Sequence, residues 1–212
     1  MILKFPDPRK STPEGIVAIG GDLEPESLKL AYSMGIFPWP IEDFPLAWFC
    51  PPERAILEFD QLHVPRSLKK VIQKHPFQLT FNQAFRQVIQ ECAHTPRAGQ
   101  DGTWITPEMI EAYSVFNQLG YASSVEVWKE GILIGGIYGV EVESIFSAES
   151  MFHHVPNASK IALLYLIQHL QSKGLTWIDI QVMTPHMEKL GARIISRDAF
   201  LDRVRSNLKA KL

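Results

Sequence analysis

The segment SSVEVWKEGILIGGIYGVEVESIFSAE, residues 123–149, determines the fold class of this chain. It contains three runs rich in β-branched and aromatic residues, separated by Glu130-Gly131 and by a second short turn. Such runs, joined by turns of so few residues, are typical of antiparallel strands. We therefore predict an antiparallel meander with strands at 123–129, 132–140 and 144–149.

The residues after the meander predict a strand that returns through a helix. A helical pattern begins at a cap supplied by Asn157 or Ser159 and ends at Gly174, and an apolar strand follows at 175–182. We expect a short helix at 184–190, a strand at 192–196 and a last helix from Asp198. This order of elements is that of the acetyltransferase-like (GNAT) sheet, so the predicted class is α+β with a mixed sheet.

The residues before the meander predict helices and a small N-terminal domain. Helical patterns cover 24–34, 66–74, 82–92 and 106–119. The first 55 residues are rich in proline and glycine, which favours loops. We predict a small loop-rich domain at 1–55 and a GNAT-like catalytic domain at 56–212.

The composition excludes several classes of protein. Hydrophobic residues make up 46% and charged residues 21%, which argues against disorder. The net charge of −2 excludes a general attraction to nucleic acid, so any RNA contact must be local. Cys50 and Cys92 lie far apart, which predicts two free buried thiols. The sequence starts without a secretory pattern and holds no long apolar run, so we expect a cytoplasmic protein without a membrane partner, by default a monomer.

The residues between the meander and the long helix argue against coenzyme A. A CoA enzyme needs a glycine-rich, basic loop there to bind the pyrophosphate, whereas residues 147–156 have no glycine and include Glu149. His153 and His154 are adjacent and diverge on a strand, which does not suit a metal. The sequence predicts no cofactor and no metal.

Two polar residues interrupt the apolar strand at 175–182. Asp179 and Gln181 are two positions apart and share one face, while Ile178 and Ile180 share the other. A carboxylate in a core strand needs partners or solvent. Asp179 either takes part in chemistry or anchors a neighbouring loop, and Glu149 either belongs to the same site or is a solvated strand end.

Six short motifs place the chain near a known family. The runs are 20–23 (GGDL), 35–39 (GIFPW), 102–106 (GTWIT), 149–152 (ESMF), 157–160 (NASK) and 178–181 (IDIQ). In this order, over residues 5–205, they resemble the leucyl/phenylalanyl-tRNA-protein transferases. The resemblance implies transfer of leucine or phenylalanine, with methionine a further candidate, from aminoacyl-tRNA to proteins with N-terminal lysine or arginine, which creates a degradation signal.

The resemblance also implies site residues. Asp179, Gln181 and Glu149 would activate and hold the amine, and an apolar pocket for the transferred side chain would comprise Ile137, Phe146, Met151 and Leu166. Stacking of the tRNA 3′ end would use Tyr32, Trp39, Trp104 and Tyr113. Phosphate contacts would come from Arg66, Lys69, Lys70, Lys74, Asn157, Ser159 and Lys160. The alternatives are core packing for the apolar and aromatic residues, a solvated face for the cations and simple helix capping for Asn157 and Ser159.

Other functions fit the same features. A related leucyltransferase would accept N-terminal Asp or Glu, and a GNAT-type enzyme would acylate a small molecule. An RNA-binding module without activity is a further alternative.

Overall fold

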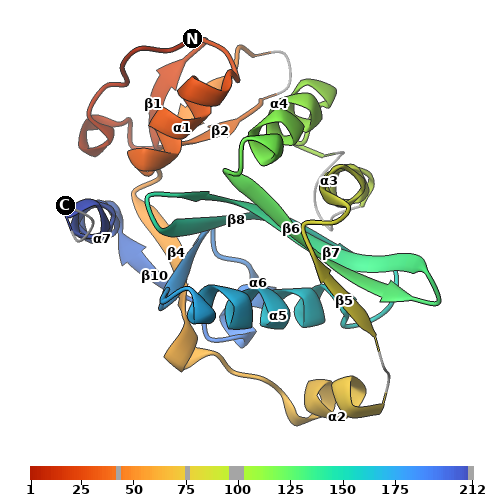
Figure 1. The fold of residues 1–212 in the computed structure, drawn as a ribbon. Helices are drawn as coiled ribbons and strands as arrows, with labels where there is room; N and C mark the ends of the chain where they lie inside the picture. Colours follow the sequence, from red (N-terminus) through yellow and green to blue (C-terminus); the bar gives the residue numbers. More distant parts are fainter. Residues whose placement is uncertain (42–43, 75–76, 96–102, 210–212) are drawn as a thin grey trace.

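The computed structural model describes residues 1–212 except 42–43, 75–76, 96–102 and 210–212, and Figure 1 shows its fold. Gly102 of the GTWIT motif therefore lies outside the described residues. The described chain contains a seven-stranded mixed sheet, a three-stranded sheet and helices on both faces of the larger sheet. The predicted α+β class with a mixed sheet is confirmed.

The predicted meander forms the middle of the large sheet. Strands β6 (Ala122–Lys129), β7 (Ile132–Val142) and β8 (Ile145–His153) pair antiparallel in sequence order. The two turns place Glu130-Gly131 and Glu143-Ser144 at positive φ, the geometry that tight hairpins require. These local pairings position β8, the strand that carries Glu149.

The predicted crossover follows β8. Helix α5 (Ala158–Ser172) packs on one face, and β9 (Trp177–Gln181) then lies parallel to β8. The two strands are in register at a single pair, Ser147 with Asp179, although β8 continues to His153. The strands therefore separate beyond this pair, and Glu149 and Gln181 lie where they separate.

Three further strands complete the sheet, in the order β10-β4-β9-β8-β7-β6-β5. β10 (Arg193–Ser196) was expected, whereas β4 (Glu53–Glu58) and β5 (Gln78–Phe81) were not. β4 pairs with both β9 and β10, so a domain boundary after residue 55 would fall inside a strand of the large sheet. The division into two domains stays a prediction.

The N-terminal part holds more regular structure than its proline content indicated. β1 (Ile16–Ile19), β3 (Ala47–Phe49) and β2 (Phe37–Trp39) form the small sheet, and α1 (Pro25–Ser33) lies where a helix was expected. These strands have three or four residues, and Pro38 lies within β2. Segments this short carry too few residues to show a period of two.

Helices divide the molecule into layers (Figure 1). α1, α3 (Phe85–His94) and α4 (Pro107–Gln118) cover one face of the large sheet, and α5 covers the other. α7 (Arg197–Lys209) packs beside β4 and β10, and α2 (Arg66–Lys74) lies beyond α5. The remaining short helices are η1 (Pro8–Lys10), η2 (Phe59–Gln61) and α6 (Pro185–Lys189).

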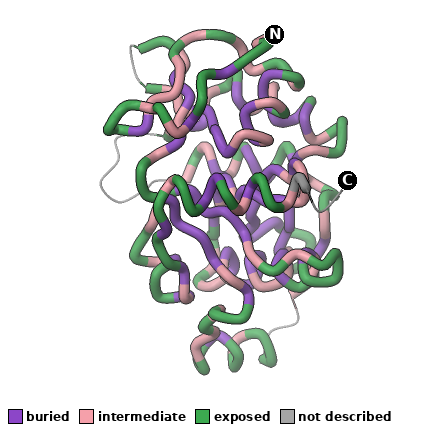
Figure 2. Tube along the Cα trace, turned by 90° about the vertical axis from the view of Figure 1, so that its left-hand side faces the viewer, coloured by how far each residue is buried: buried purple, intermediate pink, exposed green. Residues whose placement is uncertain are grey.

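The sheet separates two hydrophobic cores. The core under α1 and α4 includes Tyr138 and Phe152, and the core under α5 includes Ile137 and Phe146. Figure 2 shows buried segments through the interior and exposed ones along the outer sides of the helices. Both cysteines are buried, as predicted, and neither forms a disulfide bond within the described part of the chain. Within the described part of the chain, every helix is too short or too polar to span a bilayer.

Candidate active site

Asp179 and Gln181 share one face of β9, as predicted, and both are buried. Ile178 and Ile180 pack into the core under α5, on the opposite face. The alternation of a single strand is sufficient to produce this separation.

Arg54 supplies the partner that a buried carboxylate requires. Its Nε lies 2.8 Å from Oδ1 of Asp179 and its Nη2 lies 2.6 Å from Oδ2. The rings of Phe37 and Phe200 lie against the guanidinium, with centroids 4.7 and 4.3 Å away. Ser147 also donates to Asp179, at 3.0 Å. This bidentate pair is excluded from water, so its geometry is tightly fixed.

Sequence reasoning missed Arg54. The available signal was an arginine directly before the apolar run Ala55-Ile56-Leu57. Since this run was not recognised as a strand, the side chain of Arg54 could not be directed toward Asp179.

Gln181 has an unusual backbone conformation. Its φ is 59°, in the left-handed region that residues with a side chain seldom adopt. Its N–H donates to Oδ1 of Asp179 at 2.9 Å, and the N–H of Val182 donates to the carbonyl of Ile180 at 2.7 Å. Asp179 therefore holds the backbone that directs the Gln181 side chain. Strain of this kind is concentrated at functional sites.

Glu149 meets Gln181 where β8 and β9 separate. The Gln181 side-chain amide donates to Oε1 of Glu149 at 2.7 Å, and the Tyr32 hydroxyl donates to the same oxygen at 2.8 Å. Oε2 is buried and has no hydrogen-bond partner. Burial, and secondarily the charge of Asp179, raises the pKa of Glu149 to about 8, against the opposing hydrogen bonds from Tyr32 and Gln181.

The expected position of Glu149 at a strand end is wrong. It lies inside β8, at a bulge where Ala148 and Ser150 face consecutive residues of β7. The bulge turns its side chain toward β9 and α1 rather than toward solvent.

Comparison with known proteins identifies the family. A model described as leucyl/phenylalanyl-tRNA protein transferase matches residues 56–205, and its N-terminal domain model matches 21–52. The relative from Maridesulfovibrio salexigens named leucyl/phenylalanyl-tRNA-protein transferase is 49% identical over 93% of this chain and 83% of its own length. One of the same name from Flavobacterium psychrophilum is 48% identical over 94% of each chain.

The chain belongs to the leucyl/phenylalanyl-tRNA-protein transferase family. It is therefore an aminoacyltransferase, and the predicted family and enzyme class are confirmed. Among solved structures, L-PGS from Bacillus licheniformis aligns at 14% identity, covering 76% of this chain and 51% of that chain with a TM-score of 0.44. A GCN5-related N-acetyltransferase-like protein from Streptococcus suis aligns at 14% identity over 81% of this chain and 64% of its own, with a TM-score of 0.41.

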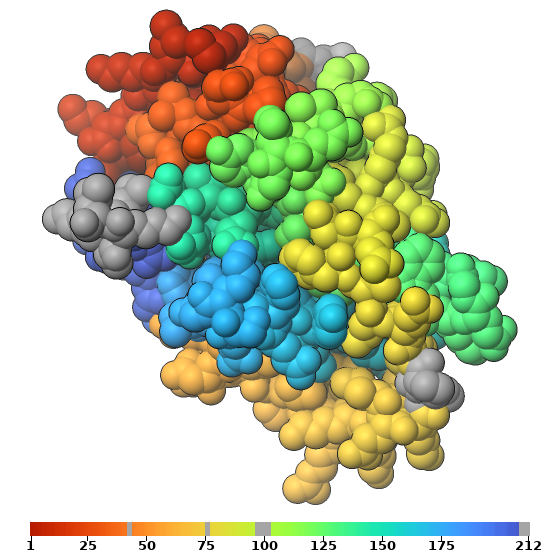
Figure 3. Space-filling view, viewed as in Figure 1, coloured from red at the N-terminus to blue at the C-terminus, as the bar shows by residue number. Residues whose placement is uncertain are grey.

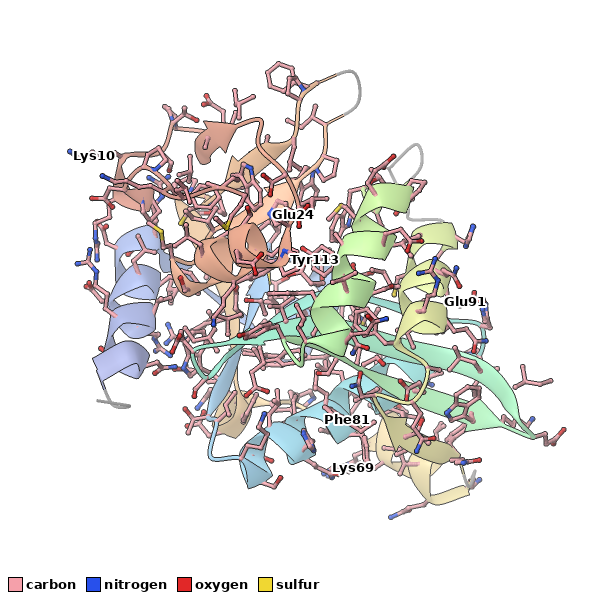
Figure 4. The ribbon with its side chains drawn as sticks, turned by 45° about the horizontal axis from the view of Figure 1, so that its top comes forward. Lys10, Glu24, Lys69, Phe81, Glu91 and Tyr113 are labelled. Carbon is pink, nitrogen blue, oxygen red and sulfur yellow. The ribbon has the colours of Figure 1, made fainter. Side chains whose placement is uncertain are left out.

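Two of the four aromatic residues expected to stack the tRNA end are buried in this family member. The hydroxyls of Tyr32 and Tyr113 are 2.5 Å apart, and Figure 4 shows Tyr113 between α4 and α1. Their rings face Phe116 and Tyr138 rather than solvent. In this structure the two hydroxyls form a hydrogen-bonded pair, and the hydroxyl of Tyr32 also donates to Glu149. A stacking role for them stays a prediction and requires the rings to become accessible.

The other two aromatic residues stack on each other. Trp39 and Trp104 have ring centroids 5.3 Å apart and an interplanar angle of 14°. Both are half-buried, so a base can stack only on an outer ring face or after the pair separates. Their role at the tRNA 3′ end stays a prediction.

The residues expected to form the side-chain pocket lie together, on the far face of the sheet from Glu149. Ile137, Phe146 and Leu166 are buried in the core under α5, and Met151 is half-buried beside it. The pocket stays a prediction.

The residues expected to bind phosphate form two groups. Arg66, Lys69, Lys70 and Lys74 are exposed on α2, at the lower edge of the face shown in Figure 3, and Lys69 lies far from Tyr113 in Figure 4. At the start of α5, the Asn157 side chain makes no capping bond but accepts from Lys160 at 3.3 Å. Ser159 is buried, with its hydroxyl 3.5 Å from His153. The phosphate contacts of both groups stay predictions.

Proposed function

We propose that this transferase moves leucine or phenylalanine from aminoacyl-tRNA to the α-amine of proteins with N-terminal lysine or arginine, within the array Arg54, Asp179, Gln181 and Glu149. The observation that carries the proposal is Oε2 of Glu149, a buried carboxylate oxygen without a partner, held beside the strained Gln181. A buried acceptor of this kind favours a cationic or amine ligand.

The chemistry requires placement more than activation. The nitrogen of the neutral α-amine forms a bond to the ester carbonyl carbon, and the bond from that carbon to the tRNA ribose oxygen breaks. The amine loses a proton and the ribose oxygen gains one. The ester is already reactive, and correct placement of the two reactants can supply ~7 to 11 kcal/mol.

Glu149 exchanges a proton with the amine, and Gln181 accepts a hydrogen bond from it. An α-ammonium hydrogen-bonded to Oε2 stabilises the carboxylate form, and the pKa of about 8 for Glu149 lies near the ~8 of an α-amine. A proton can therefore pass between the two groups at little cost. Since the Gln181 nitrogen already donates to Glu149, its amide oxygen is the atom left to accept a hydrogen from the amine.

Arg54 and Asp179 act on the backbone rather than on the substrate. Arg54 holds Asp179, and Asp179 holds the N–H of Gln181 in its left-handed conformation. In this account a change at Asp179 lowers turnover because it displaces the Gln181 amide.

Product analysis tests the proposal. Leucine or phenylalanine, each charged on its tRNA, is incubated in separate reactions with peptides that differ only in an N-terminal Arg, Lys, Asp or Glu, and the products are sequenced by mass spectrometry. We expect one added leucine or phenylalanine on the Arg and Lys peptides. Addition to the Asp and Glu peptides alone would replace the proposed acceptor class, and tight binding of coenzyme A in calorimetry would favour the small-molecule acyltransferase.

A further inference from the structure

An apolar cleft with Glu14 as its one charged lining residue opens beside the end of β9. It measures about 210 Å³ and is lined by Glu14, Phe37, Trp39, Phe49, Pro51 and Val182. Typical small-molecule pockets measure ~300 to 1,000 Å³, so this cleft suits a single side chain better than a nucleoside.

The cleft adjoins the candidate active site through two of its walls. Val182 directly follows Gln181 and is 51% exposed, although Gln181 is buried. Phe37 lies against the Arg54 guanidinium, which holds Asp179. The cleft therefore adjoins residues that contact or directly follow the array, although Gln181 itself does not line it.

The backbone fixes Glu14 at the rim of the cleft. Gly15 has a φ of 99°, its N–H donates to the Thr12 carbonyl at 2.9 Å, and its own carbonyl accepts from the N–H of Cys50 at 2.8 Å. A Cβ at Gly15 would lie 2.6 Å from Cα of Pro51, so the turn can approach the strand so closely only with glycine. The Thr12 hydroxyl, and after it the backbone of Glu14 itself, lowers the pKa of this exposed carboxyl, which is ionised at neutral pH in any case.

These walls match a long cationic side chain. The methylene groups of lysine or arginine pack well on aromatic and aliphatic surface, and their charged ends favour both aromatic faces and a carboxylate. We propose that the cleft is the specificity site for the acceptor's first residue, in which Glu14 and the walls of Phe37, Trp39 and Val182 receive an N-terminal lysine or arginine side chain. This inference rests on the proposed function, because it supplies the residue that discriminates between acceptors.

Substitutions at Glu14 test the site without touching the groups assigned to the chemistry. Glu14→Gln and Glu14→Lys are compared with the wild type and with Glu26→Gln, which removes an exposed charge from α1 away from the cleft. For each protein, kcat and KM are measured with peptides that begin with arginine or with citrulline, its uncharged analogue. The KM for Leu-tRNA is measured in parallel.

The site predicts a loss confined to the charged acceptor. In Glu14→Gln the KM for the arginine peptide should rise about three- to fivefold, and further in Glu14→Lys. The KM for the citrulline peptide and for Leu-tRNA should stay within twofold, and Glu26→Gln should match the wild type. Added salt should reduce the wild-type preference for arginine over citrulline, because the rim charge is exposed.

Three results would overturn the inference while leaving the proposed function intact. In each, the wild type transfers leucine to the arginine peptide. In the first, the Glu14 variants keep the full preference for arginine. In the second, the KM for Leu-tRNA rises instead, which would assign the cleft to the tRNA end. In the third, Glu26→Gln has the same effect as the Glu14 variants. A wild type that ignores Arg and Lys peptides would instead refute the proposed acceptor class itself.

Discussion

Arg54 is a buried cation, and its effect on stability depends on its partner, Asp179. Both Arg54 and Asp179 are almost completely excluded from water, and Nη1 of Arg54 has no hydrogen-bond partner. An ion pair of this kind adds little net stability, but the loss of one member leaves an uncompensated charge. Its contribution is a fixed orientation of Asp179, and through it of Gln181.

Single and double substitutions separate these effects. Arg54→Met should destabilise the protein by about 3 to 5 kcal/mol in urea unfolding, whereas Arg54→Met combined with Asp179→Leu should recover most of that loss. Arg54→Lys should keep the charge but lose the two-point contact, so kcat should fall while the tRNA Kd is retained. An Arg54→Met protein as stable as the wild type would show that the pair is not closed to water.

Glu149 links stability to pH. Its pKa in the folded protein is about 8, raised from the ordinary glutamate value of 4.5 chiefly by burial, so the folded state binds this proton more tightly than the unfolded chain. The stability from Glu149 is thus fully present below pH 4.5 and is lost as the pH rises through 8.

Glu149→Gln should remove this dependence. The melting temperature of the variant should approach or exceed that of the wild type at pH 8.5. Measured relative to the wild type, the melting temperature of the variant should rise by at least about 4 °C between pH 5 and pH 8.5. Scanning calorimetry at several pH values measures the shift. A constant difference across this range would contradict the raised pKa.

At the scale of single elements, the bulge of β8 directs Glu149 toward β9. The register between β7 and β8 shifts between Tyr138 and Gly139, and a Cβ on Gly139 would lie 2.4 Å from the Ser147 carbonyl oxygen and 2.5 Å from the Phe146 ring. Backbone this close leaves no room for a methyl group.

Gly139→Ala should therefore disturb both stability and activity. We expect a loss of about 1 to 3 kcal/mol, because the two strands must move apart. The transfer rate should fall as well, since the bulge positions Glu149. Ser123→Ala, on the strand that pairs with Gly139 from the other side, serves as the control and should change little. An unfolding midpoint for Gly139→Ala equal to that of the control would refute the argument.

Helix α2 is the element on which local RNA binding depends in this account. Its four cations are exposed, while Leu68 is buried and fastens the helix to the core under α5. Replacing Lys69 and Lys70 with alanine should weaken tRNA binding and reduce the salt dependence of log K by about 1 per lost phosphate contact. Lys129→Ala, at the tip of the β6–β7 hairpin, should leave the salt dependence unchanged. Identical salt slopes for all these proteins would exclude α2 from the interface.

For the whole molecule, the sequence predicted long elements better than short ones. The helices and the meander carry enough residues to show their period, and Gly35, Gly120 and Gly174 mark helix ends. The strands of the N-terminal part, together with β4 and β5, were missed because they have three to six residues and their pairing is set by contacts distant in sequence.

The residues of the candidate site were likewise predicted only where a local sequence pattern was sufficient. The shared face of Asp179 and Gln181 follows from strand alternation alone, so the sequence was sufficient. The packing of β4, β8 and β9 determines the contact of Arg54 with Asp179, the bulge at Glu149 and the left-handed conformation of Gln181. No local sequence pattern predicts this packing. The burial of Tyr32 and Tyr113 likewise appears only once α1 and α4 are packed on the sheet.

We infer that the array of Asp179, Gln181 and Glu149 promotes transfer to an amine rather than tRNA binding. The most direct test is the single-turnover rate of leucine transfer to an arginine peptide, at saturating Leu-tRNA, for the wild type and Asp179→Asn. The rate should be lower by about 100-fold or more in Asp179→Asn, with the Kd for Leu-tRNA within twofold of the wild type. An unchanged rate, or a loss explained entirely by weaker tRNA binding, would contradict it.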